Sequence, residues 1–161
     1  IAQSAGISVI FEIAGPLGVI FTGYASDKWF HARRMPVIVI GFLLLSVVLF
    51  LFNSLTSVGG KLMMGTLLFA IGFLLYGPDA LISAACAVDF GTKKGASSAA
   101  GLINGLGSTG QILGMSLPGI ISVRYGWGVL FGCFGAFVLI AALLLLPKWN
   151  AVPATAKNSK S

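Results

Sequence analysis

The chain reads Gly23-Tyr-Ala-Ser-Asp27-Lys28-Trp-Phe-His-Ala-Arg33-Arg34-Met-Pro36 between its first two long apolar segments. This stretch is a short charged loop, and it contains four of the fourteen charged side chains. Asp27 follows the end of an apolar run, where the helix dipole disfavours a carboxylate, so we expect it to pair with a nearby cation. Pro36 opens the next run, at a position where a missing N–H costs nothing. The loop therefore joins two predicted helices.

The composition indicates an integral membrane protein. Of the 161 residues, 57% are hydrophobic and only 9% are charged, and the mean hydropathy is +1.00. A soluble domain carries about 25% charged residues. The net charge of +6 therefore concerns orientation and lipid headgroups, and no nucleic-acid partner is indicated. Cys86 and Cys133 lie inside apolar runs, so we expect no disulfide, no metal site and no cofactor.

Five apolar segments are long enough to cross a bilayer as helices, which takes about 20 residues. They predict an all-α membrane protein with about five transmembrane helices, at residues 7–25, 35–52, 62–88, 96–121 and 127–146. Residues 1–146 would form one helix bundle with short connections, as is usual for antiparallel neighbours. Residues 147–161 are polar, and we expect them to form a disordered tail.

Basic residues are distributed unevenly between the two ends of these helices. One side carries only Lys61 and Arg124, and the other carries Lys28, Arg33, Arg34, Lys93, Lys94, Lys148, Lys157 and Lys160. Because basic residues concentrate on the cytoplasmic side, this bias predicts a cytoplasmic tail, in a cytoplasmic or inner membrane. Five crossings then place Ile1 on the outer side.

Four short runs resemble one family of transporters. Gly23-x-x-x-Asp27-Lys28 followed by paired arginines is similar to the cytoplasmic loop signature of the major facilitator superfamily. The wide spacing to Arg33 and Arg34 resembles that of its organophosphate:phosphate antiporter family, and residues 11–18, 76–82 and 93–101 are similar to further runs of that family. The sequence departs from the family pattern at three places, which are His31-Ala32 for a glycine-rich pair, Thr92 for a proline, and Asp79 for a neutral residue.

The resemblance implies a fold and an activity. The chain would be the last five helices of a twelve-helix facilitator, with the first helix of its six-helix half missing before Ile1. The intact protein would not be an enzyme. It would exchange an organic phosphate, such as a sugar phosphate or glycerol phosphate, for inorganic phosphate by alternating access. The family's phosphate-binding arginines would lie in the missing N-terminal part of the same transporter, so the fragment alone should not transport.

The resemblance also implies a gating loop, which comprises Gly23, Asp27, Lys28, Arg33 and Arg34.

Two acids are candidates for the central cavity. A carboxylate in the bilayer costs roughly 2.5–3.5 kcal/mol on insertion scales, so Glu12 should face a wet cavity or a cation, unless it reaches the outer interface. Asp79 either lines the same cavity or pairs with a basic residue of an absent helix. A second acid near a phosphate site would repel that substrate unless it is protonated or paired.

Further candidates for the cavity are Tyr76 and a polar stripe, Asn104, Ser108 and Gln111. The stripe has spacings of 4 and 3 and therefore shares one helix face. It either lines the cavity or makes only interhelical hydrogen bonds. Helix breaks are expected at Gly15-Pro16 and Gly77-Pro78. Close helix crossings are expected at the small-residue pairs Gly101/Gly105, Gly110/Gly114 and Gly128/Gly132.

Two other functions remain open on the sequence alone. A proton-coupled facilitator of a different solute would use Glu12 or Asp79 to bind and release a proton. A non-transporting sensor on the same fold would bind a phosphate ester and signal to a partner. An enzyme is not indicated, because the sequence shows no nucleophile–base pair and its sole histidine, His31, lies in a loop.

Overall fold

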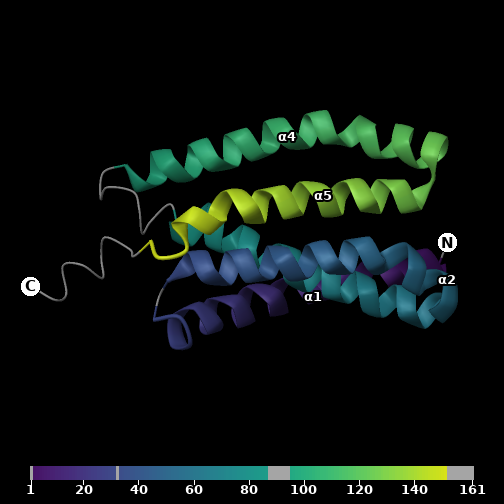
Figure 1. Ribbon diagram of the computed structural model, residues 1–161, viewed down its shortest axis with the longest axis horizontal. Helices are drawn as coiled ribbons and strands as arrows, with labels where there is room; N and C mark the ends of the chain where they lie inside the picture. The colour runs from purple at the N-terminus through teal and green to yellow at the C-terminus, as the bar shows by residue number, and fades with distance from the viewer. Residues whose placement is uncertain (1, 32, 87–94, 152–161) are drawn as a thin grey trace, which may run out of the picture.

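The computed structural model describes residues 2–31, 33–86 and 95–151, and this part of the chain is all-α (Figure 1). Its helices are α1 (Ala2–Lys28), α2 (Arg34–Ala80), the π-helix η1 (Leu81–Cys86), α4 (Ala96–Tyr125), α5 (Trp127–Leu145) and the 3₁₀-helix η2 (Leu146–Lys148). The predicted fold class is therefore confirmed. The last ten residues of the expected tail lie outside the described residues, whereas its beginning, at Pro147 and Lys148, belongs to η2.

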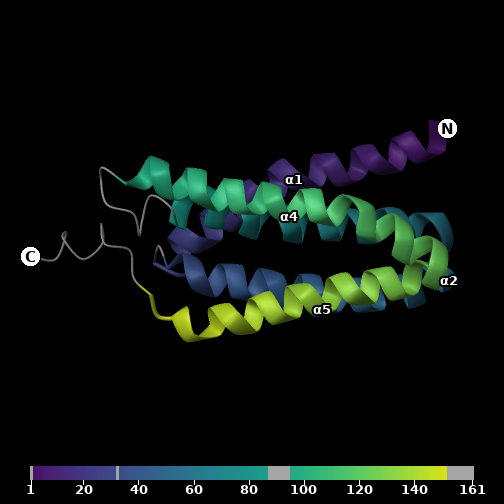
Figure 2. The same ribbon diagram turned by 90° about the horizontal axis from the view of Figure 1, so that it is seen from above.

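Helix α2 contains two of the expected membrane crossings. Its 47 residues are helical except at Gly60, where φ is 61° and ψ is −149°. The chain reverses there, so that residues 34–59 (the first half of α2) and residues 61–80 (the second half) form a helical hairpin (Figures 1 and 2). The segments predicted from the sequence left residues 53–61 as a connection between two helices. That expectation was wrong, because the serine and threonine hydroxyls of this stretch bond to carbonyl groups one turn back, and the helix continues.

By hydropathy, three helices are apolar enough to cross a membrane: Val9–Lys28, Arg34–Ser83 and Trp127–Lys148. The second of these includes both halves of the hairpin. Helix α4 is not among them, although its 30 residues would span about 45 Å at 1.5 Å per residue. Its glycines and polar side chains lower its hydropathy. The described chain thus has five helical segments of membrane length, as predicted.

The two Gly-Pro sequences do not break their helices. Pro16 lies inside a continuous α1, and Pro78 lies inside α2, so the expected breaks are wrong. Proline still removes one backbone donor from each helix. After Pro78 the hydrogen-bonding pattern changes to that of a π-helix at Leu81–Cys86, which is how this helix absorbs the irregularity.

Helix α1 packs closely against the second half of α2 through glycines. A Cβ atom added at Gly18 would lie 2.9 Å from the carbonyl carbon of Phe73, and one at Gly72 would lie 2.6 Å from the carbonyl oxygen of Phe11. Small residues permit such backbone approach in membrane bundles. The first half of α2 packs against α5, where the buried Ser46 hydroxyl donates to the carbonyl oxygen of Gly135 at 3.0 Å.

Helix α4 is exposed along most of its described length. The close crossings predicted for its glycines are not seen within the described residues, because an added Cβ at Gly101, Gly105, Gly110 or Gly114 would meet nothing within 4 Å. In α5, Gly128 faces Asn53, whereas Gly132 faces open space. The close crossing forms instead between α1 and the second half of α2, at Gly18 and Gly72.

Among the described residues, the basic side chains are distributed between the two ends of the bundle as the sequence predicted. The α1–α2 connection and η2 lie at one end of the bundle, and the turn within α2 and the α4–α5 connection lie at the other (Figure 1). The first end carries Lys28, Arg33, Arg34 and Lys148, and the second carries Lys61 and Arg124. The remaining basic residues of the predicted bias, Lys93, Lys94, Lys157 and Lys160, lie outside the described residues.

The turn at Gly60 gives a first testable prediction. Its backbone conformation lies close to a region that only glycine enters without strain, and such strain costs about 1–3 kcal/mol. Gly60→Ala in the intact protein should therefore lower the melting temperature measured in detergent. Val58→Ala, at a side chain that is 90% exposed in the same turn, is the matched control and should change it little. Equal melting temperatures for both variants would contradict the strained turn.

Candidate functional site

The charged stretch between α1 and α2 is mostly helical. Gly23, Asp27 and Lys28 lie in the last turns of α1, and Arg34 is the first residue of α2, so the actual connection is only residues 29–33. The sequence placed the end of the first helix too early. Lys28 in the last turn is favourable for the helix dipole, which helps α1 to extend this far.

Asp27 forms an ion pair with Arg34, through the carboxylate Oδ1 and the guanidinium Nη1. The pairing of Asp27 with a nearby cation, expected from the sequence, is therefore present, and Arg34 is the partner. The same Nη1 donates to the hydroxyl of Ser26 at 3.1 Å, and this hydroxyl donates to the carbonyl oxygen of Arg33 at 3.4 Å. Ser26 is fully buried, so the network ties the last turn of α1 to the start of α2.

Ser26 is a member of this network that the sequence reasoning did not name as a site residue. The sequence places it directly before Asp27, which is the signal that could have identified it. Arg33, by contrast, contributes backbone groups: its N–H donates to the carbonyl oxygen of Phe30 at 3.0 Å, and its side chain is exposed. His31 has a positive φ of 53°, so the short turn is made without glycine.

The second cluster brings together three of the predicted cavity residues. Glu12 of α1 and Asp79 of α2 both lie close enough to the Tyr76 hydroxyl for their negative charges to act on it. Tyr76 and Asp79 are three residues apart in α2 and therefore share a face of the helix. Both carboxylates are exposed and Tyr76 is half-buried, so the cluster lies on an accessible side of the helix pair.

The tyrosine ring is positioned by α1. A Cβ atom added at Gly15 would lie 3.0 Å from Cδ2 of Tyr76, so the ring rests on the surface that this glycine leaves free. The ring of Phe11 packs beside it at 5.6 Å between centroids. Gly15 was predicted as part of a helix break, but here it makes room for an aromatic ring. Phe11 was not predicted as a site residue.

The polar stripe of α4 remains apart from this cluster in the described structure. Asn104, Ser108 and Gln111 are all exposed. Helix α4 and α1 lie on the same side of the bundle in Figure 2 and at opposite edges of it in Figure 1. The stripe and the Glu12–Tyr76–Asp79 cluster are thus carried by helices that border one side of the molecule.

The whole chain, residues 1–161, matches the family model described as Major Facilitator Superfamily. The chain belongs to the major facilitator superfamily. It is therefore an integral membrane protein, and its five helical segments are a part of that fold. The superfamily resemblance seen in the loop around Asp27 is confirmed.

Individual relatives are named as transporters of phosphorylated compounds. A probable hexose phosphate transport protein of Chlamydia pneumoniae is 37% identical over 153 residues, which cover 94% of this chain and 32% of that protein. A glycerol-3-phosphate transporter of Bacillus subtilis is 32% identical over 144 residues, covering 88% and 32%. A glucose-6-phosphate exchanger of Xenopus tropicalis is 33% identical over 152 residues, covering 89% and 30%. The chain spans about a third of the length of these relatives, and no solved structure matches it significantly.

As a superfamily member, the chain shows two candidate regions and no metal centre among its described residues. No group of three or more His, Cys, Asp or Glu side chains is close enough there to hold a metal ion. Cys133 is a free, half-buried thiol, and the Cys86 side chain lies outside the described part. Lys93 and Lys94, which the resemblance had included, also lie outside it.

Proposed function

We propose that the intact protein exchanges an organic phosphate for inorganic phosphate across a membrane by alternating access. The relatives support this proposal, because they are named for hexose phosphate, glycerol-3-phosphate and glucose-6-phosphate. This chain would supply five helices of one half of the transporter. Its basic end, and with it the C-terminal tail, would face the cytoplasm.

The observation that carries the proposal is the similarity over most of this chain to relatives named for hexose phosphate and glycerol-3-phosphate, and the exposed Glu12 and Asp79 beside Tyr76 indicate where the cavity would lie. Acidic side chains within membrane-spanning segments are costly and usually mark a pathway for a solute or ion. The cations of the described chain, in contrast, all lie near helix ends: Lys28, Arg33, Arg34, Lys61, Arg124 and Lys148. We therefore expect the groups that bind phosphate to lie on helices outside this chain, facing the cluster across a shared cavity.

The test uses the intact protein in proteoliposomes loaded with inorganic phosphate. Labelled phosphate should leave when glucose 6-phosphate or glycerol 3-phosphate is added outside, at a rate at least ten times that of protein-free vesicles. Glucose and glycerol are the matched controls and should not support efflux, because they lack the phosphate group. Absence of exchange with every phosphate ester and with phosphate itself would reject the proposed function.

The main rival is a proton-coupled facilitator of another solute, and the position of two carboxylates beside one tyrosine hydroxyl favours it. In such a carrier an acid binds and releases a proton in each cycle. Glu12→Gln or Asp79→Asn would then abolish uphill uptake under an imposed proton gradient but spare exchange of solute. In the exchanger that we propose, wild-type exchange needs no gradient, and the two variants should slow exchange equally with and without one. Uptake by wild type and both variants, with the gradient on and off, decides between the two.

A further inference from the structure

An aromatic ridge with a cation above it runs along the outer side of the α1–α2 pair. Trp29, in the connection, packs edge-on against Phe21 at 5.8 Å and against Tyr24 at 6.4 Å between ring centroids. Phe21 continues to Phe73 of α2 at 5.4 Å. The ammonium group of Lys28 lies over the ring of Tyr24, 5.2 Å from its centroid. Trp29 remains 59% exposed despite these contacts.

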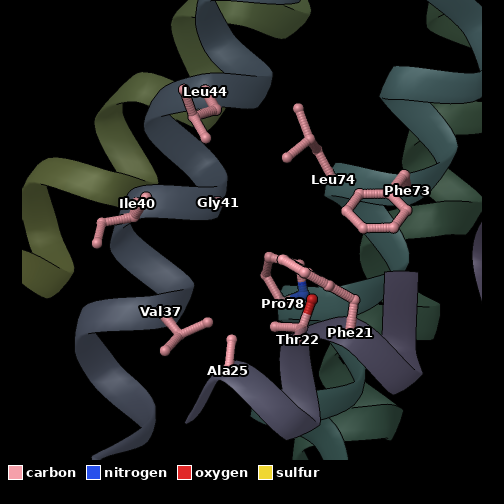
Figure 3. A pocket seen from close by; sticks show the side chains of 10 residues that line it. All are labelled: Phe21, Thr22, Ala25, Val37, Ile40, Gly41, Leu44, Phe73, Leu74 and Pro78. Carbon is pink, nitrogen blue, oxygen red and sulfur yellow. The ribbon is translucent and has the colours of Figure 1, made fainter. Parts of the chain in front are cut away.

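Phe21 and Phe73 of this ridge also line an apolar groove (Figure 3). It has a volume of about 90 Å³, and side chains from α1 and from both halves of α2 converge on it. Its rim includes Phe21, Ile40 and Leu44, which are 46%, 37% and 51% exposed, so the groove is open to the surroundings of the bundle. Its one polar side chain, Thr22, has its hydroxyl bonded to the carbonyl oxygen of Gly18 at 2.6 Å. The lining of the groove therefore suits an apolar ligand.

The part of the ridge on α1 lies opposite Glu12. Phe21 follows Glu12 by nine residues, which is about two and a half turns of helix and places the two side chains on opposite sides of α1. Lys28 lies about 10 Å further along the helix axis than Phe21, at 1.5 Å per residue. A cation, an aromatic band and an apolar groove thus follow one another along the side of α1 that is turned from Glu12.

The order of cation, aromatic rings and apolar groove matches the order of headgroups, interface and acyl chains in a bilayer. Tryptophan and tyrosine collect at the level of lipid headgroups, and lysine side chains near helix ends reach into the headgroup layer. Arg34 is engaged with Asp27 and Ser26 on the neighbouring turn, whereas the Lys28 ammonium is held over a ring and exposed to the surroundings. Lys28 is therefore placed to meet a negative charge that arrives from the bilayer.

We propose that this surface binds an anionic phospholipid, with the headgroup phosphate on Lys28, its glycerol region against Trp29 and Tyr24, and an acyl chain entering the groove beside Phe21. Charge complementarity selects the lipid class, because a zwitterionic lipid brings its own cation to the same place. The proposal is independent of the solute that the intact protein carries.

The experiment measures quenching of Trp29 fluorescence by brominated lipids in vesicles that contain the intact protein, with Trp29 as its only tryptophan. Brominated phosphatidylglycerol should bind beside Trp29 about fivefold more tightly than brominated phosphatidylcholine, the preference expected for one basic residue at a membrane surface. Lys28→Gln should reduce this preference to near one. Lys148→Gln removes the same charge from an exposed lysine at the same end of the bundle, and it should leave the preference unchanged.

Four results would contradict the proposal. Equal quenching by the two lipids in the wild type means that no anionic headgroup is selected. An equal loss of preference in Lys28→Gln and Lys148→Gln means that general surface charge, and not this ridge, attracts the lipid. Release of phosphatidylglycerol by excess inorganic phosphate means that the cation serves a soluble phosphate. Narrowing the groove with Leu44→Phe should weaken quenching by both lipids alike, and unchanged quenching would remove the acyl chain from the groove.

Discussion

Replacing Gly18 by leucine should abolish most of the yield of folded, monodisperse protein in detergent. A Cβ atom at this position would lie 2.9 Å from the carbonyl carbon and 3.0 Å from the Cα atom of Phe73, so the obstacle is backbone and cannot rotate away. Insertion of extra methylenes into a packed core costs about 1–3 kcal/mol and occasionally more. Leucine adds four carbons at the closest crossing of α1 with α2, so we expect a cost at or above the upper end.

The matched control is Gly23→Leu. Gly23 lies in the same helix, and an added Cβ would meet nothing within 4 Å among the described residues. Size-exclusion chromatography of the intact protein should therefore show a near-normal peak for Gly23→Leu, whatever the variant does to turnover, and little or none for Gly18→Leu. Normal peaks for both would mean that α1 and α2 do not pack as closely as described.

The helices could be predicted from sequence because the signal is simple. A continuous apolar run of membrane length has few alternatives to a helix, since every backbone group must be satisfied internally in lipid. The helix ends were harder to predict. The hairpin at Gly60 reverses the chain within one residue, and its neighbouring serines and threonines look like a loop in composition although they bond within the helix. The proline positions failed for the opposite reason, because one missing donor leaves the rest of the helix intact.

The glycines show that the spacing of small residues does not predict which helices pack together. Small residues four apart in α4 were expected to mark a crossing, yet the crossings form at Gly18, Gly72 and Gly77, which face backbone or short side chains of the α1–α2 pair. A spacing identifies a smooth helix face but not the helix that covers it. Partner choice depends on how the α2 hairpin folds back, which is a tertiary property.

The candidate site also contains residues that could be predicted from the sequence and residues that could not. Asp27 and Glu12 could be identified because a charge next to or inside an apolar run needs a physical reason. The support around them could not, because it comes from residues without charge. Gly15 provides the space for the Tyr76 ring, and the buried Ser26 hydroxyl connects Arg34 with the carbonyl oxygen of Arg33. Such roles follow from which surfaces meet, and only the folded chain shows that.

Asp27→Asn in the intact transporter should reduce turnover by about fivefold while leaving the folded yield close to that of the wild type. The Asp27 side chain is 64% exposed, and exposed ion pairs contribute only about 0–1 kcal/mol to folding. The pair nevertheless ties the end of α1 to the start of α2, at the end of the bundle that we propose is cytoplasmic. If the pair is present in only one of the two states, its loss can shift the balance of inward and outward states by at most its own free energy, which is about fivefold for 1 kcal/mol.

Three variants separate a gate from a general charge effect. Lys148→Gln removes a charge at the same end of the bundle that does not pair with Asp27 in this structure, and it should leave exchange nearly normal. Asp27→Glu keeps the carboxylate and should retain part of the turnover. Exchange of labelled phosphate in proteoliposomes gives the rates, and size-exclusion chromatography gives the folded yield. If Asp27→Asn transports normally, or if its rate falls only in proportion to its folded yield, the ion pair between Asp27 and Arg34 stabilises a turn and does not control the cycle.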